Sequence, residues 1–319
     1  MSNDLYPMNA AELMDRAVHV YKKSFGKQLA FSAIFGVITY VASVILSFVF
    51  LFVIGTFAGF AFFSAFSPIF GTSVVHTGGA ILATMLLLLV VVTPFVFLWY
   101  AISSAGHCVI SGPVFFGFKS RMPFKQLPRM VGRIFSALIA QAVASLPFIG
   151  VAVLFIASGI FEILIVRAPW FFALINFVFL VLLMIYLNAF SLSIAVAVFE
   201  KKTFFNTLIR SWELIRGEFW KIAGIRLVWL LSVMVIYTAL YGVLALITIL
   251  MSLIVTTLDM SAAGVAIVGI TSLVAIFASI AITFIIMPLD GVFAATLYFN
   301  QRIKKEGLDI EARLGRLLP

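Results

Sequence analysis

Charged side chains are scarce in this sequence. Only 10% of its 319 residues are Asp, Glu, Lys or Arg, whereas 64% are hydrophobic. A soluble globular domain carries about 25% charged and about 45–50% apolar residues, because its surface must face water. The mean hydropathy of +1.23 therefore excludes an ordinary soluble fold, and lipid must cover much of the surface.

Cysteine and histidine are also rare. The single cysteine, Cys108, excludes an intrachain disulfide framework and a multi-thiolate metal site. His19, His76 and His107 lie in three separate regions and form no spacing typical of a helical zinc site. No P-loop, dinucleotide-binding or nucleophile-elbow motif occurs. We therefore predict no catalytic residue, no metal and no cofactor.

Long stretches of apolar residues make up most of the sequence. Each run exceeds the roughly 20 residues that a helix needs to cross a 30 Å hydrocarbon layer. The first follows a 28-residue head of mixed charge and is too long for a cleaved leader, whose apolar part spans about 7–15 residues. We predict an all-α polytopic membrane protein with six transmembrane helices. Their expected spans are 29–63, 80–110, 134–161, 170–199, 227–258 and 263–299.

Basic residues indicate the orientation of these spans. With six crossings, 20 of the 21 bases fall on one side, and only Arg167 falls on the other. Because membrane proteins retain Lys and Arg on the cytoplasmic side, we expect both termini in the cytoplasm. The same asymmetry accounts for the net charge of +9, so nucleic acid is not an expected partner.

Three cytoplasmic segments, 1–28, 200–226 and 300–319, flank or interrupt the transmembrane domain of residues 29–299. In the first segment, Asn9 and Glu12 form a capping box that begins an amphipathic helix. Gly26 is expected to end this helix. The third segment is a basic tail.

A second amphipathic helix is predicted from Thr203 to Trp220. Its apolar face comprises Phe204, Leu208, Trp212, Ile215 and Phe219. Such a helix either lies among anionic lipid headgroups of the inner leaflet or packs against the bundle, and the sequence leaves both possibilities open. The candidate membrane-surface residues are Trp212, Trp220, Phe204, Lys201 and Lys202.

The two amphipathic segments match each other without a gap. Arg16-Ala17 aligns with Arg210-Ser211, and Phe25 aligns with Phe219, each just before an apolar run. The basic segment Lys119–Arg133 precedes a further run. We therefore expect three helical hairpins, each preceded by a cytoplasmic amphipathic helix or a basic segment.

Four charged residues are candidates for an interfacial or functional role: Asp290, Arg226, Glu213 and Arg210. A charge at the bilayer centre costs about 2.5–3.5 kcal/mol and so marks a functional position. Asp290 is the only acid in a predicted span, and we expect it near the interface, paired with a base or capping a new helical turn. Arg226 begins the fifth span and can extend toward the headgroups.

Three patches resemble a known family. They are Glu12-Leu-Met-Asp-Arg-Ala17 with Tyr21 and Phe25, then Arg210-Ser-Trp-Glu-Leu-Ile-Arg-Gly-Glu-Phe-Trp220, and finally Pro288, Leu297-Tyr298 and Arg302-Ile-Lys-Lys-Glu-Gly-Leu-Asp309. Together they resemble the bacterial membrane-domain family named after glycerophosphoryl diester phosphodiesterases. The resemblance implies a location in a bacterial inner membrane. It also implies the membrane module alone, because the family's phosphodiesterase chemistry belongs to a separate soluble barrel. Only 20 residues follow Phe299, whereas a barrel needs about 200–250.

Two functions follow as hypotheses. The first is a non-catalytic module that anchors, scaffolds or regulates a membrane or cytoplasmic protein partner. The alternative is a transporter, channel or lipid-handling protein for an apolar or amphiphilic substrate, which the apparent repeat and the prolines within the spans favour. An intramembrane enzyme would need a polar cluster that sequence spacing does not reveal.

The topology is directly testable with enzyme reporters fused after Thr72, Arg167 or Asp259. All three positions follow an odd number of predicted crossings, so each fusion should report a non-cytoplasmic location. Cytoplasmic activity of any of the three fusions would contradict the six-helix arrangement.

Overall fold

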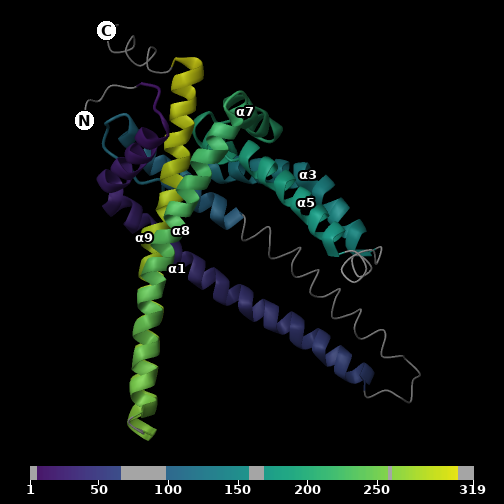
Figure 1. The fold of residues 1–319 in the computed structure, drawn as a ribbon, viewed down its shortest axis with the longest axis vertical. Helices are drawn as coiled ribbons and strands as arrows, with labels where there is room; N and C mark the ends of the chain where they lie inside the picture. The colour runs from purple at the N-terminus through teal and green to yellow at the C-terminus, as the bar shows by residue number, and fades with distance from the viewer. Residues whose placement is uncertain (1–5, 66–97, 158–168, 258–260, 308–319) are drawn as a thin grey trace. The chain divides into compact units, whose positions relative to one another are not determined.

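The computed structural model describes residues 6–65, 98–157, 169–257 and 261–307, and these ranges contain helices and no strand (Figure 1). The labelled helices are α1 (Ala10–Ala65), α3 (Leu127–Ala157), α5 (Pro169–Ala189), α6 (Ser193–Phe199), α7 (Phe205–Ile215), α8 (Phe219–Thr257) and α9 (Ser261–Glu306). A further helix without a label covers residues 98–115. The predicted all-α class is confirmed.

Five helices in the described ranges are long and apolar enough to cross a membrane. They are Ala10–Ala42, Leu127–Pro147, Ala173–Phe199, Phe219–Val255 and Ala266–Glu306. The predicted span 80–110 is helical over 98–110, but its earlier residues lie outside the described ranges. Six crossings and their pairing into three hairpins therefore stay predictions.

The chain forms two compact units, of which the smaller comprises Ala33–Ser103. In this unit the rings of Phe35 and Trp99 stack with centroids 4.4 Å apart. The Trp99 indole N–H also donates a hydrogen bond to Thr39 Oγ1. Stacked aromatic rings add to the free energy of area burial, so this contact joins the middle of α1 to Trp99 of the helix over 98–115.

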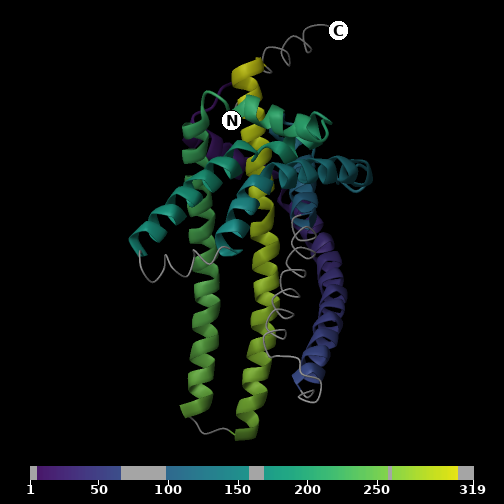
Figure 2. The ribbon, with the colours of Figure 1, turned by 90° about the vertical axis from the view of Figure 1, so that its right-hand side faces the viewer.

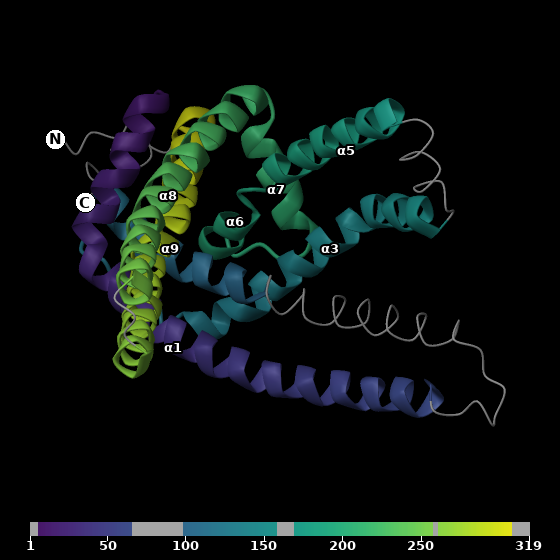
Figure 3. The same cartoon turned by 60° about the horizontal axis from the view of Figure 1, so that its bottom comes forward.

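The larger unit, Met1–Ser32 with Ser104–Pro319, contains a core drawn from helices distant in sequence. Leu13, Ala17 and Val20 of α1 are fully buried in one cluster with Leu214 of α7 and Tyr298 of α9. Helices α6 and α7 lie between α3 and α9 (Figure 3) and contact both. The two predicted amphipathic segments therefore do pack against the bundle.

Helices α8 and α9 lie side by side in both views (Figures 1 and 2) and contact each other. The Tyr241 hydroxyl donates to the Ser279 carbonyl at 3.2 Å, and Trp229 stacks on Phe293 at 4.6 Å. Most large apolar side chains from Leu227 to Ile254 of α8 are exposed. Lipid is the solvent that makes such exposure favourable.

The expected end of the first helix at Gly26 is wrong, because α1 continues to Ala65. No atom lies within 4 Å of the position that a Cβ would take at Gly26, and its backbone does not have the positive φ of a helix-ending glycine. Beyond it, Gln28, Phe31 and Ser32 bury one side of the helix against the helix over 98–115. This packing favours continued helix over a terminus.

The predicted fourth span, 170–199, is broken into α5 and α6. The three residues between Ala189 and Ser193 leave backbone groups without helical partners. Ser211 Oγ hydrogen bonds to two of these backbone groups: it accepts from the Leu192 amide at 3.3 Å and donates to the Ala189 carbonyl at 2.9 Å. Gln141 Nε2 donates to the Phe190 carbonyl at 3.3 Å. Side chains from α7 and α3 thus stabilise the break.

Close helix approach at Gly291 gives a testable prediction. A Cβ at Gly291 would lie 2.6 Å from His107 Cβ and 3.0 Å from the Ser104 carbonyl oxygen. We expect Gly291→Ala to destabilise the protein by about 1–3 kcal/mol, measured by thermal unfolding in detergent.

Gly269→Ala is the matched control in the same helix, since nothing lies within 4 Å of its Cβ position. This variant should be neutral or stabilising by about 0.5–1 kcal/mol, because alanine favours helix. Equal effects of the two substitutions would contradict a tight crossing at Gly291.

Candidate functional site

Arg210 is the centre of an ionic cluster that joins three helices. Its Nε atom donates to both carboxylate oxygens of Glu200, at 2.9 and 3.1 Å. Its terminal nitrogens pair with Glu306 at the end of α9 and with Glu213 one turn along α7, the latter at 3.4 Å. A guanidinium holds such a position well, because its fork-shaped donors match several carboxylate oxygens.

The acid Glu200 links this cluster to the apolar core. The Tyr298 hydroxyl donates to Glu200 Oε1 at 3.0 Å, and Lys202 Nζ lies 3.4 Å from Oε2. Glu200 follows the last residue of α6, where the helix dipole disfavours an acid. Three cationic or hydroxyl donors offset this cost, so α6, α7 and α9 are held together at one point.

A second ion pair attaches the turn between α7 and α8 to α9. Lys304 Nζ lies 3.0 Å from Glu218 Oε2. Partial burial alone would raise the pKa of Glu218, but the hydrogen bond and charge of Lys304, aided by Lys221, hold it below its ordinary value. Lys305 donates to the Glu213 carbonyl at 2.6 Å and to the Arg216 carbonyl. The end of α9 thus binds the end of α7 through cations at helix carbonyls, the favourable direction for a helix dipole.

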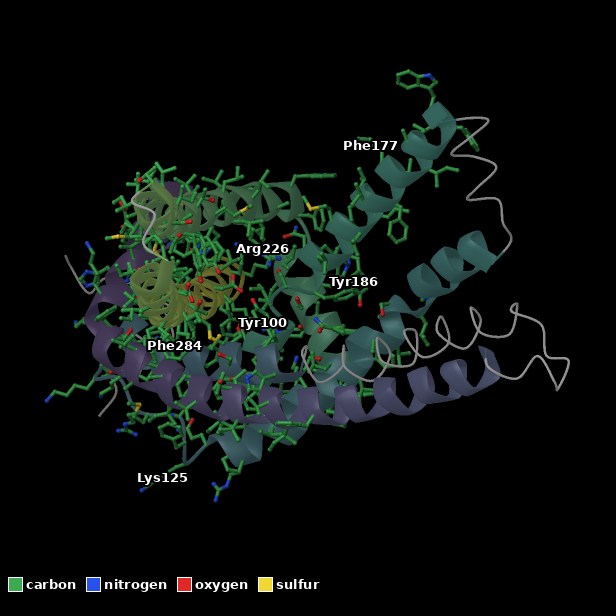
Figure 4. The ribbon with its side chains drawn as sticks, turned by 90° about the horizontal axis from the view of Figure 1, so that it is seen from below. Tyr100, Lys125, Phe177, Tyr186, Arg226 and Phe284 are labelled. Carbon is green, nitrogen blue, oxygen red and sulfur yellow. The ribbon has the colours of Figure 1, made fainter. Side chains whose placement is uncertain are left out.

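The predicted functional residues separate into different surroundings. Arg210 and Glu213 belong to the ionic cluster. Arg226 NH1 lies 3.4 Å from the Leu187 carbonyl and 3.5 Å from Asn188 Oδ1, at the end of α5 (Figure 4). Asp290 is exposed and lies inside the continuous helix α9, which leaves no new helix start for it to cap, and its pairing with a base stays a prediction. Pro288 is accommodated without ending the helix.

The predicted apolar face of α7 is only partly buried. Trp212 and Phe204, two of the candidate membrane-surface residues, are 41% and 42% exposed, whereas Leu208 of the same face is buried. The buried residues are Thr207, Leu208, Ser211, Leu214 and Ile215. Two small polar side chains also lie on the buried side and hydrogen bond to backbone carbonyls: Ser211 at the helix break, and Thr207 at the Phe204 carbonyl at 2.6 Å.

The outward side of α7 is nevertheless apolar. Phe205, Ile209 and Trp212 are exposed along it, and Trp220 at the start of α8 is 74% exposed. Of the predicted surface bases, Lys201 is exposed with a left-handed φ of 57°, and Lys202 pairs with Glu200. We call Phe205, Ile209, Trp212 and Trp220 the α7 surface.

A buried polar cluster lies where α1 crosses the helix over 98–115. Gln28 Oε1 lies 2.6 Å from His107 Nδ1, and Gln28 Nε2 donates to Ser111 Oγ at 2.9 Å. Because an amide oxygen only accepts, this places the imidazole proton on Nδ1. Ser32 Oγ then lies 3.5 Å from the accepting Nε2. Phe31 packs edge-on against the same imidazole ring.

The order hydroxyl, imidazole, amide resembles a nucleophilic triad, but its surroundings do not suit that chemistry. Ser32, His107 and Gln28 are each fully buried. A neutral glutamine also stabilises a developing imidazolium far less than a carboxylate does. These side chains therefore act as a hydrogen-bonded clamp between helices, whose satisfied partners specify one register.

Several contributors to these clusters were not identified from the sequence. Glu200, Glu306 and Tyr298 hold Arg210 and its neighbours, and Gln28 organises the buried cluster. Glu200 and Glu306 could have been identified from the sequence as candidate ion-pair partners, because each is an acid within an otherwise basic segment. Gln28 carried none, because one amide beside an apolar run is ordinary. Within the described ranges, no group of three or more His, Cys, Asp or Glu side chains is placed to hold a metal ion.

The ionic cluster predicts a specific loss of stability. We expect Arg210→Ala to lower the free energy of unfolding by about 2–3 kcal/mol, because it removes several charged hydrogen bonds and leaves Glu200 with fewer partners. Lys22→Ala, at an exposed base of α1, should change it by less than about 0.5 kcal/mol. Thermal unfolding in detergent measures both, and similar values would argue against a structural role for Arg210.

Comparison of the chain with protein-family models, with curated proteins and with solved structures finds no match.

Proposed function

We propose that this chain is a non-catalytic membrane module that anchors or scaffolds a protein partner at the cytoplasmic face of a bacterial cell membrane. The proposal rests on the two different sides of α7. One side of α7 is fixed to α6 and α9 by Arg210, while its outward side leaves apolar side chains exposed. A rigid helix with a second apolar side is suited to bind something outside the chain.

The arrangement of the three family-like patches supports the same proposal. Residues of the opening patch, including Leu13 and Ala17, share one core with Leu214 of the middle patch and Leu297 of the last. Arg16 donates to the Phe115 carbonyl at 2.8 Å, and the Met8 amide donates to Asn300 Oδ1 at 2.9 Å. Patches that jointly build one helical platform are what a membrane module of that family would need. We propose membership of it on this basis.

Transport or lipid handling is favoured by one observation, the break between α5 and α6. Broken helices line the substrate sites of many transporters, where freed backbone groups face the substrate. Here side chains hydrogen bond to the freed groups: Ser211 at Ala189 and Leu192, Gln141 at Phe190, and Arg226 at Leu187. Since side chains of this chain already hydrogen bond to these backbone groups, we rank scaffolding above transport.

Photo-cross-linking in cells that naturally make the protein tests the proposal. A benzophenone amino acid replaces Asn206, an exposed polar residue of α7, or Phe277, an exposed apolar residue of α9. We expect one discrete protein adduct from position 206 and none from position 277, which lies in a lipid-facing part of the helix. Mass spectrometry then identifies the adduct.

A second cross-linker at Ile209, an exposed residue of the α7 surface, should capture the same protein. Adducts only with lipid, or with different proteins at 206 and 209, would count against a scaffold. Retention of a single solute or lipid by the purified chain, without any protein, would favour the transport alternative.

A further inference from the structure

Positive charge is concentrated in one segment that the proposed function does not use. Residues 113–161 contain five bases and no acid, so they supply five of the nine net charges of the chain. The bases are Lys119, Arg121, Lys125, Arg129 and Arg133. In the described ranges, the ion pairs involve bases of residues 202–210 and 302–304 and none of these five. The first four are exposed.

Apolar side chains alternate with these bases along a short loop. Between the helix over 98–115 and α3, the order is Phe118-Lys-Ser-Arg-Met-Pro-Phe-Lys125. Phe118 is 64%, Met122 37% and Phe124 41% exposed. Lys125 projects away from the helices in Figure 4. Interleaved basic and large apolar side chains are typical of segments that lie at a lipid headgroup layer, where each type finds its own partner.

The loop has a defined conformation. Gly117, with a φ of +83°, ends the preceding helix, and the Phe118 amide donates to the Pro113 carbonyl at 2.8 Å. The Gln126 and Leu127 amides both donate to the Pro123 carbonyl at 2.8 Å. A loop fixed in this way loses little conformational entropy when it binds, which favours affinity.

Contacts with α1 hold the loop from the other side. Lys27 Nζ donates to the Ser120 carbonyl, and the Phe124 ring packs against Phe31 with centroids 5.8 Å apart. Lys27 thereby brings a sixth cation beside the five of this segment. The loop is thus fixed between α1 and the start of α3.

The position of the segment relative to a candidate span suits a phosphate layer. α3 begins at Leu127, and its candidate membrane span covers Leu127–Pro147. Arg129 and Arg133 lie in the first two turns, within about 10 Å of the helix start at 1.5 Å per residue. Bases at such a depth reach headgroup phosphates while their stems stay among apolar groups.

We propose that residues 118–125, with Arg129 and Arg133, form a binding site for anionic phospholipid headgroups of the inner leaflet, into which Phe118, Met122 and Phe124 insert. This site rests on the proposed function, because it requires the basic side of the chain to face the cytoplasm. It is separate from the α7 surface and is built from different helices. It would orient the module and recruit acidic lipid around it.

The test uses the full chain with a fluorescent label at Met122→Cys. Cys108 is fully buried, so an environment-sensitive nitrobenzoxadiazole label reacts with the introduced thiol. The labelled protein in neutral detergent is titrated with dioctanoyl phosphatidylglycerol, dioctanoyl phosphatidylcholine or inorganic phosphate. We expect a blue shift with phosphatidylglycerol at much lower concentration than with phosphatidylcholine, and no shift with phosphate alone.

Two triple variants of equal charge locate the site. Lys119→Gln/Arg121→Gln/Lys125→Gln should weaken phosphatidylglycerol binding at least about tenfold, since one base near an anionic surface changes association about fivefold. Lys22→Gln/Lys23→Gln/Lys221→Gln removes three exposed bases elsewhere and should bind like the parent. Thermal unfolding of both variants shows whether they remain folded.

Three outcomes would overturn the proposal. They are an unchanged titration of the loop variant, equal loss in both variants, and an acidic protein that co-purifies through this loop while lipid gives no response. A failed lipid titration leaves the cross-links from α7 unaffected. Conversely, absence of a cross-linked partner leaves the lipid response measurable, so the two proposals fail separately.

Discussion

The attachment of α7 to α9 through Arg210 determines which side of α7 faces outward. This residue bonds Glu200, Glu213 and Glu306, which belong to three different parts of the chain. The contact fixes the rotation of α7 about its own axis. Leu208 and Leu214 are thereby buried and Ile209 and Trp212 exposed. The α7 surface therefore depends on this ionic contact together with the apolar packing of Leu214 and Ile215 in the core.

Polar side chains inside the larger unit have a related role. Ser211, Gln141 and Arg226 bind backbone groups at the break between α5 and α6, and Gln28 binds His107 between two other helices. In an apolar environment an unpaired backbone group is costly, so such side chains specify where a helix can stop. Polar groups determine the geometry, whereas apolar residues supply most of the surface.

Composition and long apolar runs were sufficient to predict the class of fold. The predicted spans 29–63, 134–161, 170–199, 227–258 and 263–299 each overlap a helix that is long enough to cross a membrane. Helix ends were harder, because Gly26 continues a helix where local sequence suggests an end, and Ala189 ends one where apolar periodicity suggests continuation. Both outcomes depend on side chains far away in sequence, Ser111 and Ser211 among them.

The candidate site was predictable only in part. Arg210 and Glu213 were identified as polar residues of interest, but their partners Glu200 and Glu306 come from segments whose proximity no local pattern reveals. The burial of Ser211 on α7 was not predictable, because its hydrogen-bond partners lie at the break between α5 and α6, whereas Trp212 of the predicted apolar face stays exposed. An aromatic residue at a membrane interface does not need to enter a protein core.

The exposed length of the α8–α9 pair has a mechanical consequence. From Leu227 to Ile254 the exposed apolar stretch of α8 is about 40 Å long at 1.5 Å per residue, which exceeds the roughly 30 Å of a hydrocarbon layer. The pair must tilt or thicken the bilayer around it to match. Because α9 continues without interruption to Glu306, a change of tilt in a thinner or thicker bilayer reaches the residues that hold α7. Glu306 at the end of α9 pairs with Arg210 of α7, so such a tilt would move these two residues together.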